Sequence, residues 1–157
     1  MYSRPALPAR SVTVRPVETA DQPILEIKLR FSGDFDPVQI TEVLGLRPSS
    51  VRRGGVPTPA GIIPPESGWD LRLAGGDGWD FEPYLLITEQ FIAQNLTSLA
   101  EARHVSGAVL TLVLIAYTPR SLPGLTVPAS LIALLANIDA EIVVDGMWTP
   151  EDSSSDQ

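Results

Sequence analysis

The sequence has 157 residues, of which 44% are hydrophobic, and it carries no cysteine and a formal net charge of −8. This length suits a single domain with one core, and the lack of cysteine excludes disulfides and thiolate metal sites and favours a reducing compartment. The longest apolar run, residues 108–117, is about half of the roughly 20 residues that a membrane-spanning helix needs. We therefore expect a cytoplasmic protein with no membrane partner.

The charges are unevenly distributed along the chain. Residues 1–55 hold eight Lys and Arg against six Asp and Glu, whereas residues 56–157 hold three against thirteen. Nucleic acid binding requires a basic face, so a chain this acidic is not expected to bind nucleic acid. A basic protein is the partner that the acidic part would attract, although a net charge of this size also serves solubility alone.

The first part of the chain predicts an extension, a strand and a short helix. Residues 1–20 are expected to be loosely ordered or to form an edge strand, with residues 12–17 as that strand. Residues 24–31 alternate apolar and charged side chains, which is the period of a strand with one wet face. After it, Asp36 suits an N-cap and Gly45 suits a C-terminal cap, so we expect a helix of about eight residues between them.

Hydrophobic periodicity predicts five more elements. The strand near residue 110 is apolar on both faces, which places it inside the sheet, and the long helix has a weak point near Asn95. The predicted elements are strands at 68–73, 108–117 and 141–144 and helices at 80–103 and 128–137.

Strands with one charged face indicate helices that cover only the other face. We expect an α+β fold: a four- to five-stranded, mostly antiparallel sheet with helices packed on one face, an open-faced sandwich. The single domain is expected to span residues 21–150, and residues 151–157 are expected to form a disordered tail.

One loop is left as a candidate ligand site. Helix caps account for the polar residues up to Pro48, but not for residues 49–55, where Arg52 and Arg53 stand beside two glycines. Guanidinium forks on such a loop can grip a carboxylate or a phosphate, and Trp69 could stack on a ligand. The alternatives are a solvated loop and a core tryptophan. The ligand-binding candidates are Arg52, Arg53 and Trp69.

The wet face of the two alternating strands is a second candidate surface, for a protein partner. Its residues are Glu26, Lys28, Arg30, Asp70 and Arg72. No catalytic residue, metal site or cofactor is predicted, because the only histidine, His104, suits a helix C-terminus and the serines lack an evident base. Whether the protein is an enzyme stays undecided, with the balance against it.

A motif in this chain resembles a known family. Its parts are Asp36-Pro37, Ile40-Thr41, Leu44-Gly45-Leu46 and Pro48, followed by Gly54 and Trp69. On these residues the chain is similar, over residues 24–144, to the bacterial family called domain of unknown function 4279 (DUF4279). The resemblance implies an α+β fold and a bacterial origin, and no activity. The family's last strand alternates aspartates with apolar residues, and Val143 departs from that pattern.

Three functional hypotheses follow. The leading one is a non-enzymatic protein-binding module, for which an immunity-type protein that neutralises a toxin is an analogy in size and acidity. The second is a sensor of a small anionic ligand, or a weak enzyme, centred on Arg52 and Arg53. The third is a homodimeric structural module that associates through Val109, Val113 and Ile115, the second apolar face of the strand at 108–117.

Overall fold

The structure is a computed structural model, and it describes residues 22–118 and 125–148. The strand predicted at 12–17 and the tail at 151–157 lie outside these residues. The elements are β1 (Ile24–Gly33), α2 (Pro37–Leu44), β2 (Ser50–Arg52), β3 (Ser67–Asp77), α3 (Glu82–Gln94), α4 (Leu96–Ser106), β4 (Val109–Thr118), α5 (Ala129–Asn137) and β5 (Glu141–Trp148).

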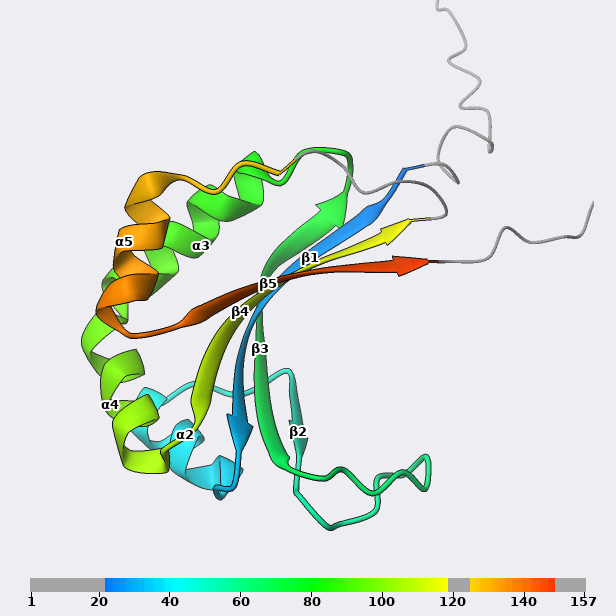
Figure 1. Ribbon diagram of the computed structural model, residues 1–157, viewed down its shortest axis with the longest axis vertical. Helices are drawn as coiled ribbons and strands as arrows, with labels where there is room; N and C mark the ends of the chain where they lie inside the picture. Colours follow the sequence, from blue (N-terminus) through cyan, green and yellow to red (C-terminus); the bar gives the residue numbers. More distant parts are fainter. Residues whose placement is uncertain (1–21, 119–124, 149–157) are drawn as a thin grey trace, which may run out of the picture.

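The strands form one five-stranded sheet in the order β2-β3-β1-β4-β5. All neighbouring strands are antiparallel except β4 and β5, which are parallel and are joined through α5. The four helices lie on one side of the twisted sheet, as Figure 1 shows. The predicted α+β class, with a mostly antiparallel sheet and helices on one face, is confirmed.

Alternation along β1 builds the core. Its apolar side chains, Leu25, Ile27, Leu29 and Phe31, have no exposed surface and point toward the helices. The charged residues between them point to the other side of the sheet, which we call the open face. Because β1 has a neighbouring strand on each edge, its apolar row becomes the centre of the molecule.

The short helix α2 has the ends that the sequence predicts. The Asp36 side chain accepts a hydrogen bond from the Val38 backbone N–H at 3.0 Å, and Gly45 adopts the left-handed conformation with φ of 64°. A residue with a Cβ would be strained at that φ, which explains the glycine. Trp69 holds the helix to the sheet, because its indole N–H donates to the Thr41 hydroxyl at 3.0 Å.

The structure has the helix break that the sequence indicated near Asn95 and one strand that the sequence did not predict. The long predicted helix is divided at Asn95 into α3 and α4, and the Asn95 side-chain amide donates to the Phe91 carbonyl at 2.8 Å. The segment after Pro48 contains β2, which the sequence did not predict because three residues are too few to show a period. Its pairing with β3 brings Arg52 onto the sheet.

β4 is buried on both faces. On its open-face side Val113 and Ile115 are 4% and 3% exposed, and Val109 at the strand start is 46% exposed. On that face of β4 two of the three residues of the homodimer hypothesis are therefore covered, and dimerisation through this strand stays a prediction. Among the described residues, no helix is both long and apolar enough to cross a membrane.

Candidate functional site on the open face of the sheet

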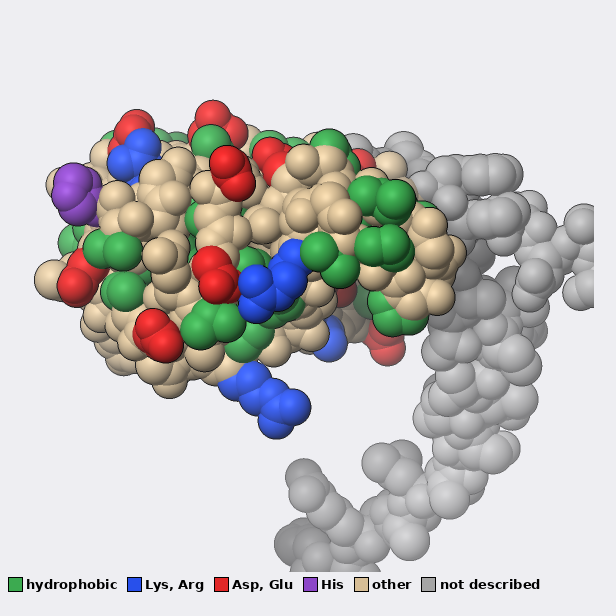
Figure 2. Space-filling model, turned by 90° about the horizontal axis from the view of Figure 1, so that it is seen from below, with side chains coloured by type: hydrophobic (Ala, Val, Ile, Leu, Met, Phe, Trp, Pro, Cys, Tyr) green, Lys and Arg blue, Asp and Glu red, His purple; other side chains and the backbone are tan. Residues whose placement is uncertain are grey.

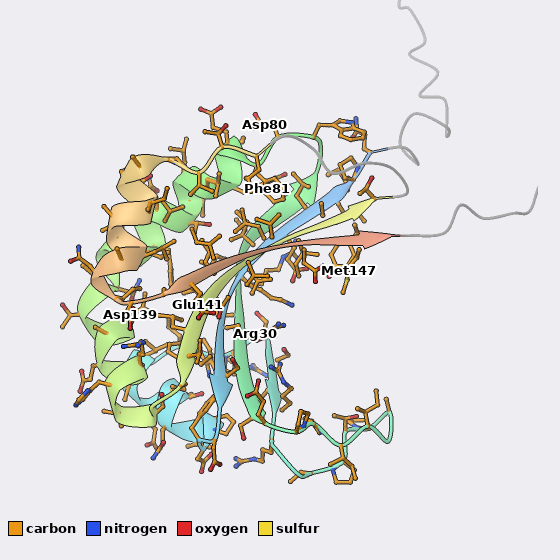
Figure 3. The ribbon with its side chains drawn as sticks, viewed as in Figure 1. Arg30, Asp80, Phe81, Asp139, Glu141 and Met147 are labelled. Atoms are coloured by element: carbon orange, nitrogen blue, oxygen red, sulfur yellow. The ribbon has the colours of Figure 1, made fainter. Side chains whose placement is uncertain are left out.

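The candidate site is built by strand register. Asp70 on β3 lies directly opposite Arg30 on β1, and Ser50 on β2 lies opposite Asp70 on its other side. Directly opposed residues point to the same face of a sheet. The register therefore collects charged side chains from three strands on the open face, where Figure 3 shows Arg30 on the side away from the helices.

Asp70 is the centre of the site. Its side chain is only 6% exposed, and its two carboxylate oxygens accept hydrogen bonds from Arg30 Nε at 2.9 Å and Nη2 at 3.0 Å. Lys28 Nζ and Arg52 Nη1 each lie 3.8 Å from the same carboxylate. We call these four residues the Asp70 cluster: one buried carboxylate under three cations.

The pairing with Asp70 also affects Arg30. The hydrogen bond to the Asp70 carboxylate raises the pKa of Arg30 above its ordinary value, against the opposing effect of burial. Arg30 is thus a fixed, charged partner. Lys28 and Arg52 contact the carboxylate beyond hydrogen-bond distance, so Asp70 does not occupy their N–H groups.

Gly68 makes room for the Arg52 side chain. A Cβ at Gly68 would clash with the guanidinium group of Arg52, so this group lies against the bare α-carbon of Gly68 on β3. Gly68 and Arg52 are directly opposite each other in the β2–β3 register. The absence of a side chain at Gly68 therefore allows the Arg52 guanidinium to lie close to the sheet and next to Asp70.

The far end of the open face carries a tyrosine between charges. Burial and the carboxylates of Glu26 and Asp145 raise the pKa of the Tyr117 phenol, and the Arg72 guanidinium opposes this effect. These four residues come from β4, β1, β5 and β3, respectively. The charged surface therefore extends along the sheet from the Asp70 cluster toward β5.

Cations concentrate on the open face although the chain is acidic. The described residues contain seven Lys and Arg against fourteen Asp and Glu. Four of the seven lie on sheet strands and point to the open face: Lys28, Arg30, Arg52 and Arg72. The sheet also turns Glu26, Asp70, Glu141 and Asp145 to this face, so its charges are mixed. The helices carry mainly acids: Glu42 in α2, Glu82 and Glu89 in α3 and Glu101 in α4.

The three predicted ligand-binding residues are not brought together. Trp69 has no exposed surface, points into the core and lies edge-on to Phe31 with ring centroids 5.8 Å apart. Arg53 donates to the Asp36 carboxylate at 3.0 Å at the start of α2. Only Arg52 reaches the open face. The five predicted partner-binding residues, in contrast, all lie on that face, with Asp70 covered by its cations.

A projecting apolar loop was missed by the sequence reasoning. It connects β2 to β3 over residues 53–66 and is closed by hydrogen bonds from Gly55 N to the Pro64 carbonyl and from Thr58 N to the Ile62 carbonyl. Ile62 and Ile63 are 66% and 61% exposed. Seen from below, hydrophobic side chains gather over this end of the molecule with Lys and Arg beside them (Figure 2). The signal was present in the sequence, as two adjacent isoleucines between prolines.

Two surface cavities lie away from the Asp70 cluster. One, of about 290 Å³, opens at the start of α3 between Asp80, Phe81, Glu82 and Pro128, and Figure 3 shows Asp80 and Phe81 at a distance from Arg30. The other, of about 330 Å³, lies between α4 and α5 at Leu96 and Ile138. Neither contains a described basic residue. Within the described ranges, no three acidic or histidine side chains meet as a metal site would require.

Taken together, the fold and its charged face define an open-faced α+β sandwich with an exposed, cation-bearing sheet. The family profile described as Domain of unknown function (DUF4279) matches residues 25–147. The chain therefore belongs to this family, and the identification made from its motif is confirmed. Comparison with curated proteins and with solved structures finds no match.

Proposed function

We propose that this protein is a non-enzymatic binding module whose open sheet face receives an acidic surface of a protein partner. The observation that carries the proposal is the gathering of four of the seven described cations on the one face that the helices leave uncovered. The open face as a whole carries both signs, but the Asp70 cluster sets three cations around one carboxylate. A locally basic cluster on an acidic molecule attracts an acidic surface of a partner, and the attraction sets orientation and association rate.

The Asp70 cluster supplies both rigidity and free donors. Arg30 is committed to Asp70 through two hydrogen bonds and fixes the carboxylate. Lys28 and Arg52 stay near it by charge, with 17% and 30% of their side chains exposed, and Lys28 Nζ also lies 3.7 Å from the Glu26 carboxylate, beyond hydrogen-bond distance. Their N–H groups can therefore turn to a carboxylate of the partner, and Arg72 extends the same surface along β3.

The loop at 53–66 favours a protein over a small molecule as the partner. Val56, Ile62 and Ile63 are more than half exposed on a loop that starts beside Arg52. Four prolines and internal hydrogen bonds hold the loop in one shape, so that little conformational entropy is lost when it binds. Apolar anchors next to charges are the composition of protein interfaces.

A pair of charge reversals tests the proposal. Fluorescein-labelled poly-glutamate and poly-lysine peptides serve as probes, and fluorescence anisotropy measures their binding at low salt. Arg52→Glu removes a cation of the open face, whereas Arg47→Glu makes the same charge change at an exposed residue outside it. We expect poly-glutamate binding to weaken about tenfold in Arg52→Glu, equivalent to about 1.4 kcal/mol, and to stay nearly unchanged in Arg47→Glu.

Three outcomes would contradict the proposal. Equal weakening in both variants would mean that only net charge matters. A preference for poly-lysine would assign binding to the acidic helices and to a basic partner, as the sequence predicted. Competition by inorganic phosphate at low concentration would instead favour the small-anion sensor. The immunity-type role stays a prediction from size and acidity.

A further inference from the structure

The edge strand β5 is the least protected part of the sheet. It is eight residues long and pairs with β4 on one side only within the described chain. The other sheet edge, β2, has three residues. Exposed edges are usually blunted by charged side chains, Pro, bulges or short length. β5 has no Pro and no break in its register with β4, and its only charged residues are Glu141 and Asp145.

Apolar side chains are exposed on both faces of β5. Ile142 and Val144 are 36% and 48% exposed on the helix side, and Val143 and Met147 are 44% and 45% exposed on the open side. Figure 3 shows Met147 on the side away from the helices. Single exposed apolar residues also occur on β1, β2 and β4, at Ile24, Val51 and Val109, but β5 exposes four along one strand.

We propose that a second copy of this chain pairs with β5 edge to edge, in antiparallel orientation, about a two-fold axis at Val144. Such an axis, perpendicular to the sheet, keeps the open faces of both copies on the same side and joins the two sheets into one of ten strands. The inference is independent of the binding function proposed above, because it uses a different edge of the molecule.

Charge and size select this register. With the axis at Val144, Glu141 faces Met147 of the second copy and Asp145 faces Val143, so no two acids stand directly opposite each other. An axis at Val143 would set Glu141 against Asp145, and an axis at Asp145 would set that residue against itself. Like charges directly opposite destabilise strand pairs.

Shape supports the same register on the helix side. Ile142 faces Gly146 of the second copy, and the bare α-carbon of that glycine leaves space for the isoleucine side chain. Val144 meets Val144 on the axis, and β-branched pairs of this kind stabilise neighbouring strands. Ile132 on α5 is 49% exposed and lies in the helix that joins β4 to β5. The contact is small by the standard of stable interfaces, so the dimer is expected to be weak and concentration-dependent.

Cysteine cross-linking tests the register in the full chain. The protein has no cysteine of its own, so Val144→Cys places one thiol on the axis, directly opposite its copy. Ile142→Cys is the matched control, because its copy lies four residues further along, about 13 Å away, beyond the reach of a disulfide. We expect Val144→Cys to form a covalent dimer in air, and Ile142→Cys to stay monomeric under the same conditions.

Sedimentation measurements supply an independent readout. The unmodified protein should associate as its concentration rises, and more strongly in high salt, because Asp145 and Glu141 of both copies lie diagonally near each other. Val144→Lys should abolish association, and Asp145→Asn should strengthen it several-fold. A monomer at every concentration, or cross-linking of Ile142→Cys as readily as of Val144→Cys, would overturn the proposal.

Discussion

Two of the aspartate–arginine pairs among the described residues have nearly equal lengths but very different surroundings. Asp36 and Arg53 are joined at 3.0 Å near the surface, where their side chains are 52% and 49% exposed. Asp70 and Arg30 are joined at 2.9 Å, where the aspartate side chain is 6% exposed. The comparison shows that burial and neighbouring charges, rather than the distance between the two groups, decide how much an ion pair contributes to stability.

Each pair does a distinct task. Asp36 acts mainly as a helix cap, because its carboxylate accepts a hydrogen bond from the Val38 N–H. Its ion pair with Arg53 is exposed to solvent and is a secondary contact. Asp70 instead offsets part of the charge of three cations that strand register brings together. Removal of Asp36 therefore loosens one end of a helix, whereas removal of Asp70 leaves three neighbouring cations without the carboxylate that attracts them.

The largest expected effect comes from breaking the buried pair. Asp70→Ala should lower the free energy of unfolding by about 2–3 kcal/mol, somewhat below the usual loss for a buried pair because Arg30 remains partly exposed. Urea unfolding with an unchanged denaturant slope would measure it. The double variant Asp70→Leu with Arg30→Met removes both charges, and it should recover part of the loss. Equal stability of Asp70→Ala and the unmodified protein would contradict the central role of Asp70.

A smaller expected effect separates binding from stability. Gly68→Ala introduces a Cβ where the Arg52 guanidinium lies, and the flexible end of that side chain can move away. We expect stability to change by no more than about 1 kcal/mol, while poly-glutamate affinity falls. The nitrogen-15 shift of Arg52 Nε would report the displacement. An unchanged affinity with a shifted Nε signal would show that the position of Arg52 is unimportant for binding.

The smallest expected effect concerns the exposed pair and depends on pH. The Val38 hydrogen bond and the nearby Arg53 lower the pKa of Asp36. A lowered folded-state pKa means that this stabilisation is complete above the unfolded pKa of about 3.9 and is lost as pH falls through the folded value. Asp36→Asn keeps the cap and removes the charge, so its melting temperature should approach that of the unmodified protein below pH 4.

The Asp36→Ala variant separates the cap from the charge. Alanine removes the cap as well, so Asp36→Ala should melt below Asp36→Asn at neutral pH. High salt should reduce the difference in melting temperature between Asp36→Asn and the unmodified protein, because salt screens an exposed ion pair. If the melting temperatures of Asp36→Asn and the unmodified protein still differ by the same amount at pH 2, the charge of the Asp36 carboxylate is not the cause of the difference.

Local determinants explain which parts of the fold the sequence predicts. The ends of α2 were predicted correctly because cap residues act within one turn of the helix. The surroundings of Asp70 could not be predicted, since alternation placed it on the wet face and its covering cations come from strands far away in sequence. The sequence grouped Trp69 and Arg53 with Arg52 in one ligand site. In the structure the alternation of β3 turns Trp69 into the core, and Arg53 contacts Asp36 instead.

The position of β1 in the sheet has a consequence for the growing chain. Its two neighbours, β3 and β4, end at residues 77 and 118, so synthesis supplies one partner well before the other. While α3 and α4 are still being made, β1 has one open edge beside an apolar row that is fully buried in the finished protein. A nascent chain of this family is thus most prone to aggregation during that interval, until β4 is synthesised and pairs with β1.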